Sequence, residues 1–100
     1  MFWGSVIKEG KPFKTNTVLE ENEYPVLHIS NVALPANAKP GKYYLLASSG
    51  KDVNNLTLAC LQKDKNEVQA LDLYVNVSQQ VTLSVSGAGG ELHLSGFFEP

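Results

Sequence analysis

The sequence contains no arginine, a single cysteine and no long apolar run. Proteins that read nucleic-acid bases rely on the guanidinium fork of arginine, so its absence argues against DNA or RNA as a direct ligand. Cys60 alone excludes an intrachain disulfide, and its distance in sequence from His28 and His93 gives no zinc-ligand spacing. No segment approaches the roughly 18 apolar residues of a membrane span, and the N-terminus lacks the pattern of a signal peptide. We therefore expect a soluble intracellular protein that binds no metal or cofactor and contacts no membrane.

The composition that remains is that of one small globular domain spanning residues 1–100. The chain is 43% hydrophobic and 18% charged, and its formal net charge is -2. A slightly acidic surface favours a basic partner. A domain of this size buries only about two thirds of its unfolded surface, so we expect association between copies to supply additional burial.

Apolar and polar residues alternate through most of the chain, which is the pattern of β-strands with one buried face. The strands are short and evenly spaced, and eight of them in 100 residues predict an all-β fold, either a sandwich or a jelly roll. The best helical candidate, residues 60–71, carries Asp64 and Asn66 at its centre and suits a turn better. Turn residues interrupt the strands at residues 35–41, 48–54 and 63–66.

Two of the turns are expected to close hairpins. One hairpin would join a strand at residues 2–7 to a strand at residues 13–18. The other would join residues 81–86 to residues 92–98 through the glycine-rich link 87–90, whose glycines permit positive φ.

The apolar phase of residues 27–34 slips by one position near Ser30 and Asn31. A β-bulge at this point would keep the apolar residues on both sides of it facing the core. A strand that is buried on both faces is the alternative.

Two segments are apolar on both faces, residues 43–46 and, with one acidic interruption, residues 68–77. A strand of a single antiparallel sandwich exposes one face to water, so we expect the outer faces of these segments to contact neighbouring subunits. The acidic interruption must be solvated, paired or hydrogen-bonded, either structurally or in binding a partner. The predicted oligomer interface residues are Tyr44, Leu46, Asp72 and Tyr74.

None of the residue types that could carry catalysis stands in a catalytic pattern. Ser95 lies outside a nucleophile elbow and two positions from His93 on a strand, so these residues and Asp72 suit a solvated strand face better than a triad. The glycine-rich link lacks the helix and the Lys-Ser/Thr pair of a phosphate loop. Cys60 is expected to be an inert core thiol, and His28 a hydrogen-bonded structural histidine.

Three carboxylates, Glu20, Glu21 and Glu23, fall within four positions just before a strand. A solvated acidic loop is the simplest interpretation. The functional alternative is a docking patch for a basic partner.

Five segments carry a family resemblance that runs the length of the chain. They are Phe2-Trp3-Gly4, residues 27–34, residues 68–74, Val85-Ser86-Gly87 and residues 92–97. In their order and spacing they resemble the nucleoplasmin core domain. The resemblance is closest to the N-terminal nucleoplasmin-like domain of nuclear FKBP-type prolyl isomerases and to plant nucleoplasmin-like histone deacetylase-related proteins, which share a Phe-Trp-Gly start and a His-Leu-Ser/Thr-Gly-aromatic ending.

The resemblance implies an eight-stranded jelly roll that assembles into a pentameric ring and serves as a histone chaperone in the nucleus, including the nucleolus. Such a module catalyses nothing; it shields core histones and releases them for nucleosome assembly. Glu20, Glu21 and Glu23 fall where the family carries a short acidic tract, so they are the expected histone contacts. Residues 35–42 depart from the Ala-Lys-Asp-Glu pattern with which vertebrate relatives stack two pentamers, which leaves pentamer and decamer both open.

The resemblance also implies that the chain is one domain of a longer protein that carries acidic and basic tracts and an isomerase domain. Two other functions stay open. The domain could be a structural pentamerisation platform whose ligands are bound by downstream segments. It could also be an enzyme, although the sequence shows no aromatic pocket signature for prolyl isomerisation and no metal-ligand set for deacetylation.

Overall fold

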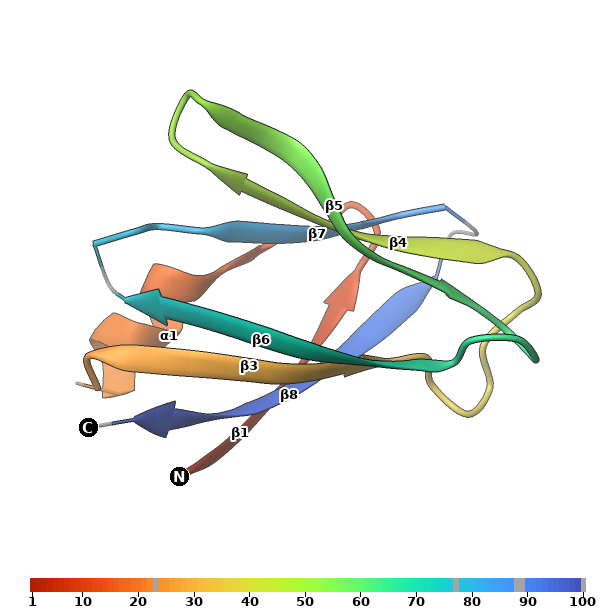
Figure 1. Cartoon of the computed structure of the whole chain (residues 1–100), viewed down its shortest axis with the longest axis horizontal. Coiled ribbons are helices and arrows are strands. Elements are labelled where there is room, and N and C mark those ends of the chain that lie inside the picture. The colour runs from red at the N-terminus through yellow and green to blue at the C-terminus, as the bar shows by residue number, and fades with distance from the viewer. Residues whose placement is uncertain (23, 77, 88–89, 100) are drawn as a thin grey trace.

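The computed structural model describes residues 1–22, 24–76, 78–87 and 90–99. These residues form eight strands and one helix, with the strands arranged in two sheets packed face to face (Figure 1). The strands are β1 (Phe2–Lys8), β2 (Phe13–Lys14), β3 (Val26–Ala33), β4 (Lys42–Ser49), β5 (Val53–Gln62), β6 (Val68–Asn76), β7 (Thr82–Ser86) and β8 (Glu91–Glu99), and the helix is α1 (Thr15–Asn22).

Both sheets have four antiparallel strands. Sheet A has the order β1-β8-β3-β6 and sheet B has the order β2-β7-β4-β5. This alternation of strands between two sheets is the arrangement of an eight-stranded jelly roll. The predicted all-β fold class is therefore confirmed.

The core lies between the sheets and is built by the alternation seen in the sequence. In β8 the buried residues are Leu92, Leu94, Gly96 and Phe98, and the residues between them face outward. The largest fully buried side chain is that of Tyr43, and its hydroxyl donates a hydrogen bond of 2.7 Å to the carbonyl oxygen of Lys39. A buried phenol is thereby satisfied, so it packs without the cost of an unpaired polar group.

The predicted bulge in β3 is confirmed. The register of β3 shifts between Ile29 and Asn31 against both of its neighbours, β6 and β8. Ile29 and Val32 are both fully buried although they are three residues apart. The extra residue thus turns both halves of the strand toward the core.

The two predicted hairpins are wrong. The turn after β1 exists, with Gly10 at a φ of 83° and a 3.0 Å hydrogen bond from the nitrogen of Lys11 to the carbonyl of Lys8. However, β1 belongs to sheet A and β2 to sheet B, and β7 and β8 are divided in the same way. Alternation specifies which face of a strand is buried but not which sheet the strand joins. Both connections therefore cross between the layers.

The helix α1 replaces most of the strand predicted at residues 13–18. The hydroxyl of Thr15, which is fully buried, donates to the carbonyl of Val81 at 3.1 Å and accepts from its nitrogen at 3.2 Å. Leu19, one turn later, is 1% exposed and enters the core. Tertiary anchoring at these two positions overrides the strand pattern. No helix in the described ranges is long and apolar enough to cross a membrane.

Cys60 is exposed, so its prediction as a core thiol is wrong. It lies opposite Tyr44 on β5, which forms the edge of sheet B. Its neighbours Ala59 and Leu61 are the residues that β5 buries. An apolar sequence neighbourhood therefore did not reveal which face Cys60 occupies.

Candidate functional site

The outer face of sheet A exposes most of the large hydrophobic side chains that the sandwich leaves in solvent. Eight such residues are exposed in the described part of the chain, and five of them lie on this one face. A concentration of this kind marks an interaction surface, whereas scattered apolar residues would not. We call the five residues the apolar face: Phe2 (78% exposed), Val6 (50%), Val68 (58%), Tyr74 (50%) and Phe97 (38%).

An aromatic row crosses all four strands of sheet A on this face. Phe2 lies opposite Phe97, and His28 lies between Phe97 and Tyr74. The His28 ring stacks on Tyr74 with centroids 4.0 Å apart and an angle of 5°, and it meets Phe97 edge-on at 4.7 Å and 87°. The imidazole is therefore held between two aromatic rings.

Asp72 fixes the remaining freedom of the imidazole. Its Oδ1 lies 2.9 Å from the Nε2 of His28, so the Nε2–H group donates a hydrogen bond to the carboxylate. The Nδ1 of His28 is buried and has no hydrogen-bond partner among the described residues. The prediction of a hydrogen-bonded structural histidine is therefore correct for one ring nitrogen. Asp72 accepts a structural hydrogen bond from a neighbouring strand, which is one of the two roles expected for it.

The pKa of the Tyr74 phenol is raised, first by desolvation and then by the negative charges of Asp72 and Glu99. The phenol consequently stays neutral and can donate a hydrogen bond throughout the ordinary pH range. Asp72 has a side chain that is 81% exposed, so its carboxylate stays hydrated on the single chain. A partner that covered this face would need to leave the carboxylate wet or pair it.

The predicted interface residues are divided between the two sheets. Asp72 and Tyr74 point outward from β6 in sheet A. Tyr44 and Leu46 are half-buried and face outward from β4 in sheet B, opposite Ser86 and Ser84 of β7. The fold brings Asp72 and Tyr74 together but separates them from Tyr44 and Leu46 by the thickness of the sandwich.

The acidic segment starts on a helix rather than in the expected loop. Glu20 is exposed in the last turn of α1, and Glu21 follows it in the same helix. Glu23 lies outside the described residues. Negative charge at a helix C-terminus opposes the helix dipole, and no basic residue occupies the last turn of α1. These charges therefore do not stabilise the helix.

The catalytic residue types remain apart. The carboxylate of Asp72 contacts His28 and not His93, which is exposed on β8 two positions before Ser95.

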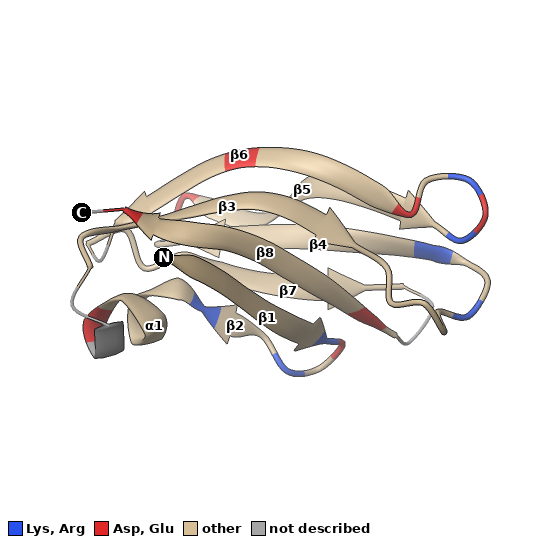
Figure 2. Cartoon of the chain, turned by 90° about the horizontal axis from the view of Figure 1, so that it is seen from below, with Lys and Arg blue, Asp and Glu red and all other residues tan. Residues whose placement is uncertain are grey.

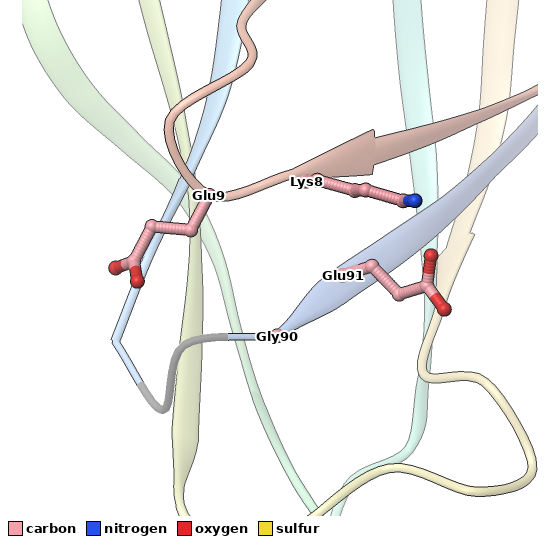
Figure 3. Close-up of a pocket in the computed structure, with 4 residues that line it drawn as sticks. All are labelled: Lys8, Glu9, Gly90 and Glu91. Carbon is pink, nitrogen blue, oxygen red and sulfur yellow. The ribbon is translucent and has the colours of Figure 1, made fainter.

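An open hollow of about 350 Å³ is lined by Lys8, Glu9, Gly90 and Glu91, and Figure 3 shows Lys8 and Glu91 on one side of it and Glu9 turned away. The described residues contain no group of three or more His, Cys, Asp or Glu that could hold a metal ion.

Comparison with known proteins gives a family and a fold. The model of the nucleoplasmin-like domain family matches residues 2–99. The Drosophila NLP core, whose crystal structure provides insight into pentamer formation and histone binding, aligns with a TM-score of 0.80 at 17% identity over 99% of this chain and 98% of that chain. The nucleoplasmin-like N-terminal domain of Drosophila FKBP39 aligns with a TM-score of 0.71 at 22% identity over 100% of this chain and 89% of that chain. No curated protein sequence matches the chain.

Proposed function

Because the chain belongs to the nucleoplasmin-like domain family, as the sequence resemblance predicted, we propose that it is a homo-pentameric histone chaperone module of the nucleus. The observation that carries this proposal is the apolar face, since a monomer gains nothing from exposing five large hydrophobic residues on one sheet. The association of the Drosophila NLP core with pentamer formation and histone binding supports the same function. The proposed role is binding and release, without catalysis. The FKBP39 relative is an N-terminal domain, which supports our proposal that this chain is likewise one domain of a longer protein.

The proposed ring contact joins different surfaces of neighbouring copies. Asp72 and Tyr74 would contribute from sheet A of one copy, and Tyr44 and Leu46 from sheet B of the next. A contact between unlike surfaces generates a closed ring when the rotation per copy closes, whereas a contact between identical surfaces stops at a dimer. Since the two sets lie on opposite faces of the sandwich, each copy can contact two neighbours at once.

The proposed histone contacts are Glu20, Glu21 and Glu23. Five copies of net charge -2 carry -10 in total, so assembly concentrates a charge that is weak on one chain. Exposed charge pairs are individually weak and are screened by salt, which makes binding depend on their number and on ionic strength.

The test neutralises these carboxylates in the triple variant Glu20→Gln, Glu21→Gln, Glu23→Gln. Glutamine keeps the size of the side chain and removes only the charge. The affinity for core histones, measured by fluorescence titration from 50 to 300 mM salt, should fall about tenfold at the lowest salt and converge with the parent at the highest.

The matched control is Asp64→Asn, Glu67→Gln, Glu91→Gln, which changes the net charge equally at the opposite end of the sandwich. It should bind histones nearly as well as the parent. Equal losses in both variants would show that only total charge matters and would contradict the assignment of the three glutamates.

A structural pentamerisation platform is the second candidate, because the apolar face is extensive while the acidic segment is short. Under that function the chain would form the ring, as judged by its mass in light scattering, yet histones would not bind it at any salt concentration. Ring formation and histone titration together therefore separate the two functions.

A further inference from the structure

Four connections lie in the same half of the sandwich, although they lie far apart in the sequence. They join β1 to β2, β3 to β4, β5 to β6 and β7 to β8. The nitrogen of Glu9 donates to the carbonyl of Gly90 at 3.2 Å, which links the first connection to the last. The Nζ of Lys63 donates to the carbonyl of Ala38 at 2.7 Å, which ties the β5–β6 turn to the β3–β4 loop.

Most of the basic residues of the chain lie on these connections or at the strand ends beside them, and Figure 2 shows them spread from the β1–β2 turn, below the middle of the sandwich, to the loops at its right-hand end. Six of the eight lysines lie there against four carboxylates, a formal charge of +2 that leaves -4 on the rest of the chain. The acidic part of α1 lies at the opposite end (Figure 2). We call the six residues the lysine end: Lys8, Lys11, Lys39, Lys42, Lys63 and Lys65.

The positive charge of the lysine end is not neutralised within the chain. Among the described residues, none of the six ammonium groups lies within 4.0 Å of a carboxylate. Two of the four nearby carboxylates are instead held by backbone amides. Glu67 accepts from the nitrogen of Asp64 at 2.8 Å, and Glu9 accepts from the nitrogen of Gly87 at 3.3 Å. Five of the six lysines are exposed, so their charges face water.

The identity of these cations indicates the chemistry of the partner. Arginine offers a rigid fork that matches phosphate and base edges, whereas lysine is a hydrated point charge that accepts many geometries. A surface of lysines without arginine suits a flexible chain of carboxylates better than a nucleic acid. We propose that the lysine end is a docking surface for an acidic polypeptide segment, one rich in consecutive Glu and Asp. This surface is separate from the proposed histone contacts and opposite to them in charge.

The test uses a fluorescent peptide of twelve consecutive glutamates, titrated into the whole chain at 50 mM salt. The variant Lys39→Glu, Lys65→Glu reverses two exposed charges of the lysine end, and it should weaken binding about tenfold. The control Lys14→Glu, Lys51→Glu makes the same change in net charge at two exposed lysines elsewhere, and it should weaken binding less than about threefold. A thermal melt of each variant verifies that it is folded.

Three results would overturn the proposal. Equal loss in both variants would show attraction to total charge, with no docking surface. Tighter binding of a twelve-nucleotide single-stranded DNA than of the peptide, with the same sensitivity to Lys39→Glu, Lys65→Glu, would assign the surface to nucleic acid. The third result has three parts: the particle mass of the protein alone rises at low salt, Lys39→Glu, Lys65→Glu abolishes this rise, and the self-association blocks peptide binding. This result would assign the lysine end to contact with the acidic end of a second copy. Histone titrations are read independently, so failure here leaves the proposed chaperone function untouched.

Discussion

Replacing Phe2 by alanine should break the ring while leaving the fold of each copy almost unchanged. Phe2 is 78% exposed on the edge strand β1, so its phenyl group contributes little to the stability of one chain, within about 0.5 kcal/mol. Burying about 120 Å² of the phenyl group against a neighbouring copy would contribute about 3 kcal/mol per contact. A ring of five loses five such contacts, about 15 kcal/mol, which raises the concentration of half-assembly about 500-fold.

Multi-angle light scattering over a dilution series measures this shift. The parent should give a particle of about 55 kDa, five copies of 10.9 kDa, and the variant should dissociate at far higher concentration. The control is Leu56→Ala, a residue that is 55% exposed but lies on the β4–β5 hairpin, outside the apolar face. A parent that is monomeric at micromolar concentration, or a Phe2→Ala ring as persistent as the parent's, would refute the reasoning.

Three further changes test the fold and the apolar face. Gly96→Ala would press its Cβ into the carbonyl oxygen of His28 and should destabilise the chain by about 3 kcal/mol in urea unfolding, whereas Gly4→Ala in the adjacent strand meets nothing closer than 3.5 Å and should be nearly neutral. Thr15→Val removes the hydroxyl that serves both polar groups of Val81 and should cost about 2 kcal/mol by the same assay. Because the pKa of Tyr74 is raised in the folded chain, its contribution to stability is fully present below the ordinary tyrosine pKa of about 10 and is lost above it. The urea midpoint should therefore fall as the pH rises above about 10, and Tyr74→Phe should reduce that fall; an identical fall in the variant would contradict the assignment.

The features of the fold that were predictable from the sequence are those governed by local alternation. The slip near Ser30 predicted the bulge because the sequence has one extra residue between the two halves, and both can face the core only if a bulge takes up that residue. The exchange of strands between sheets was not predictable, because an alternating strand pairs equally well in either layer. The helix α1 was missed because its stability comes from Thr15 and Leu19 contacting the rest of the fold, not from the helix propensity of its residues.

For the site, the interface residues of β6 and β4 were predicted because apolar side chains occupied both parities of their strands, and their place in an interface stays a prediction. The rest of the apolar face was not found. Phe97 could have been recognised, since the burial of Phe98 places its neighbour outside. The row formed with Phe2 and His28 depends on the register of three strands, which no local pattern specifies.

The bulge of β3 takes up one residue that the alternation of the strand does not need. The hydroxyl of Ser30 donates one long bond, 3.4 Å, to the carbonyl of Ser95, so exchange for another small residue should be tolerated. Deleting Ser30 would place Ile29 and Val32 two positions apart, so a regular strand without the bulge would keep both side chains in the interior. Related sequences should therefore vary in identity at this position, and some should lack the residue together with the bulge.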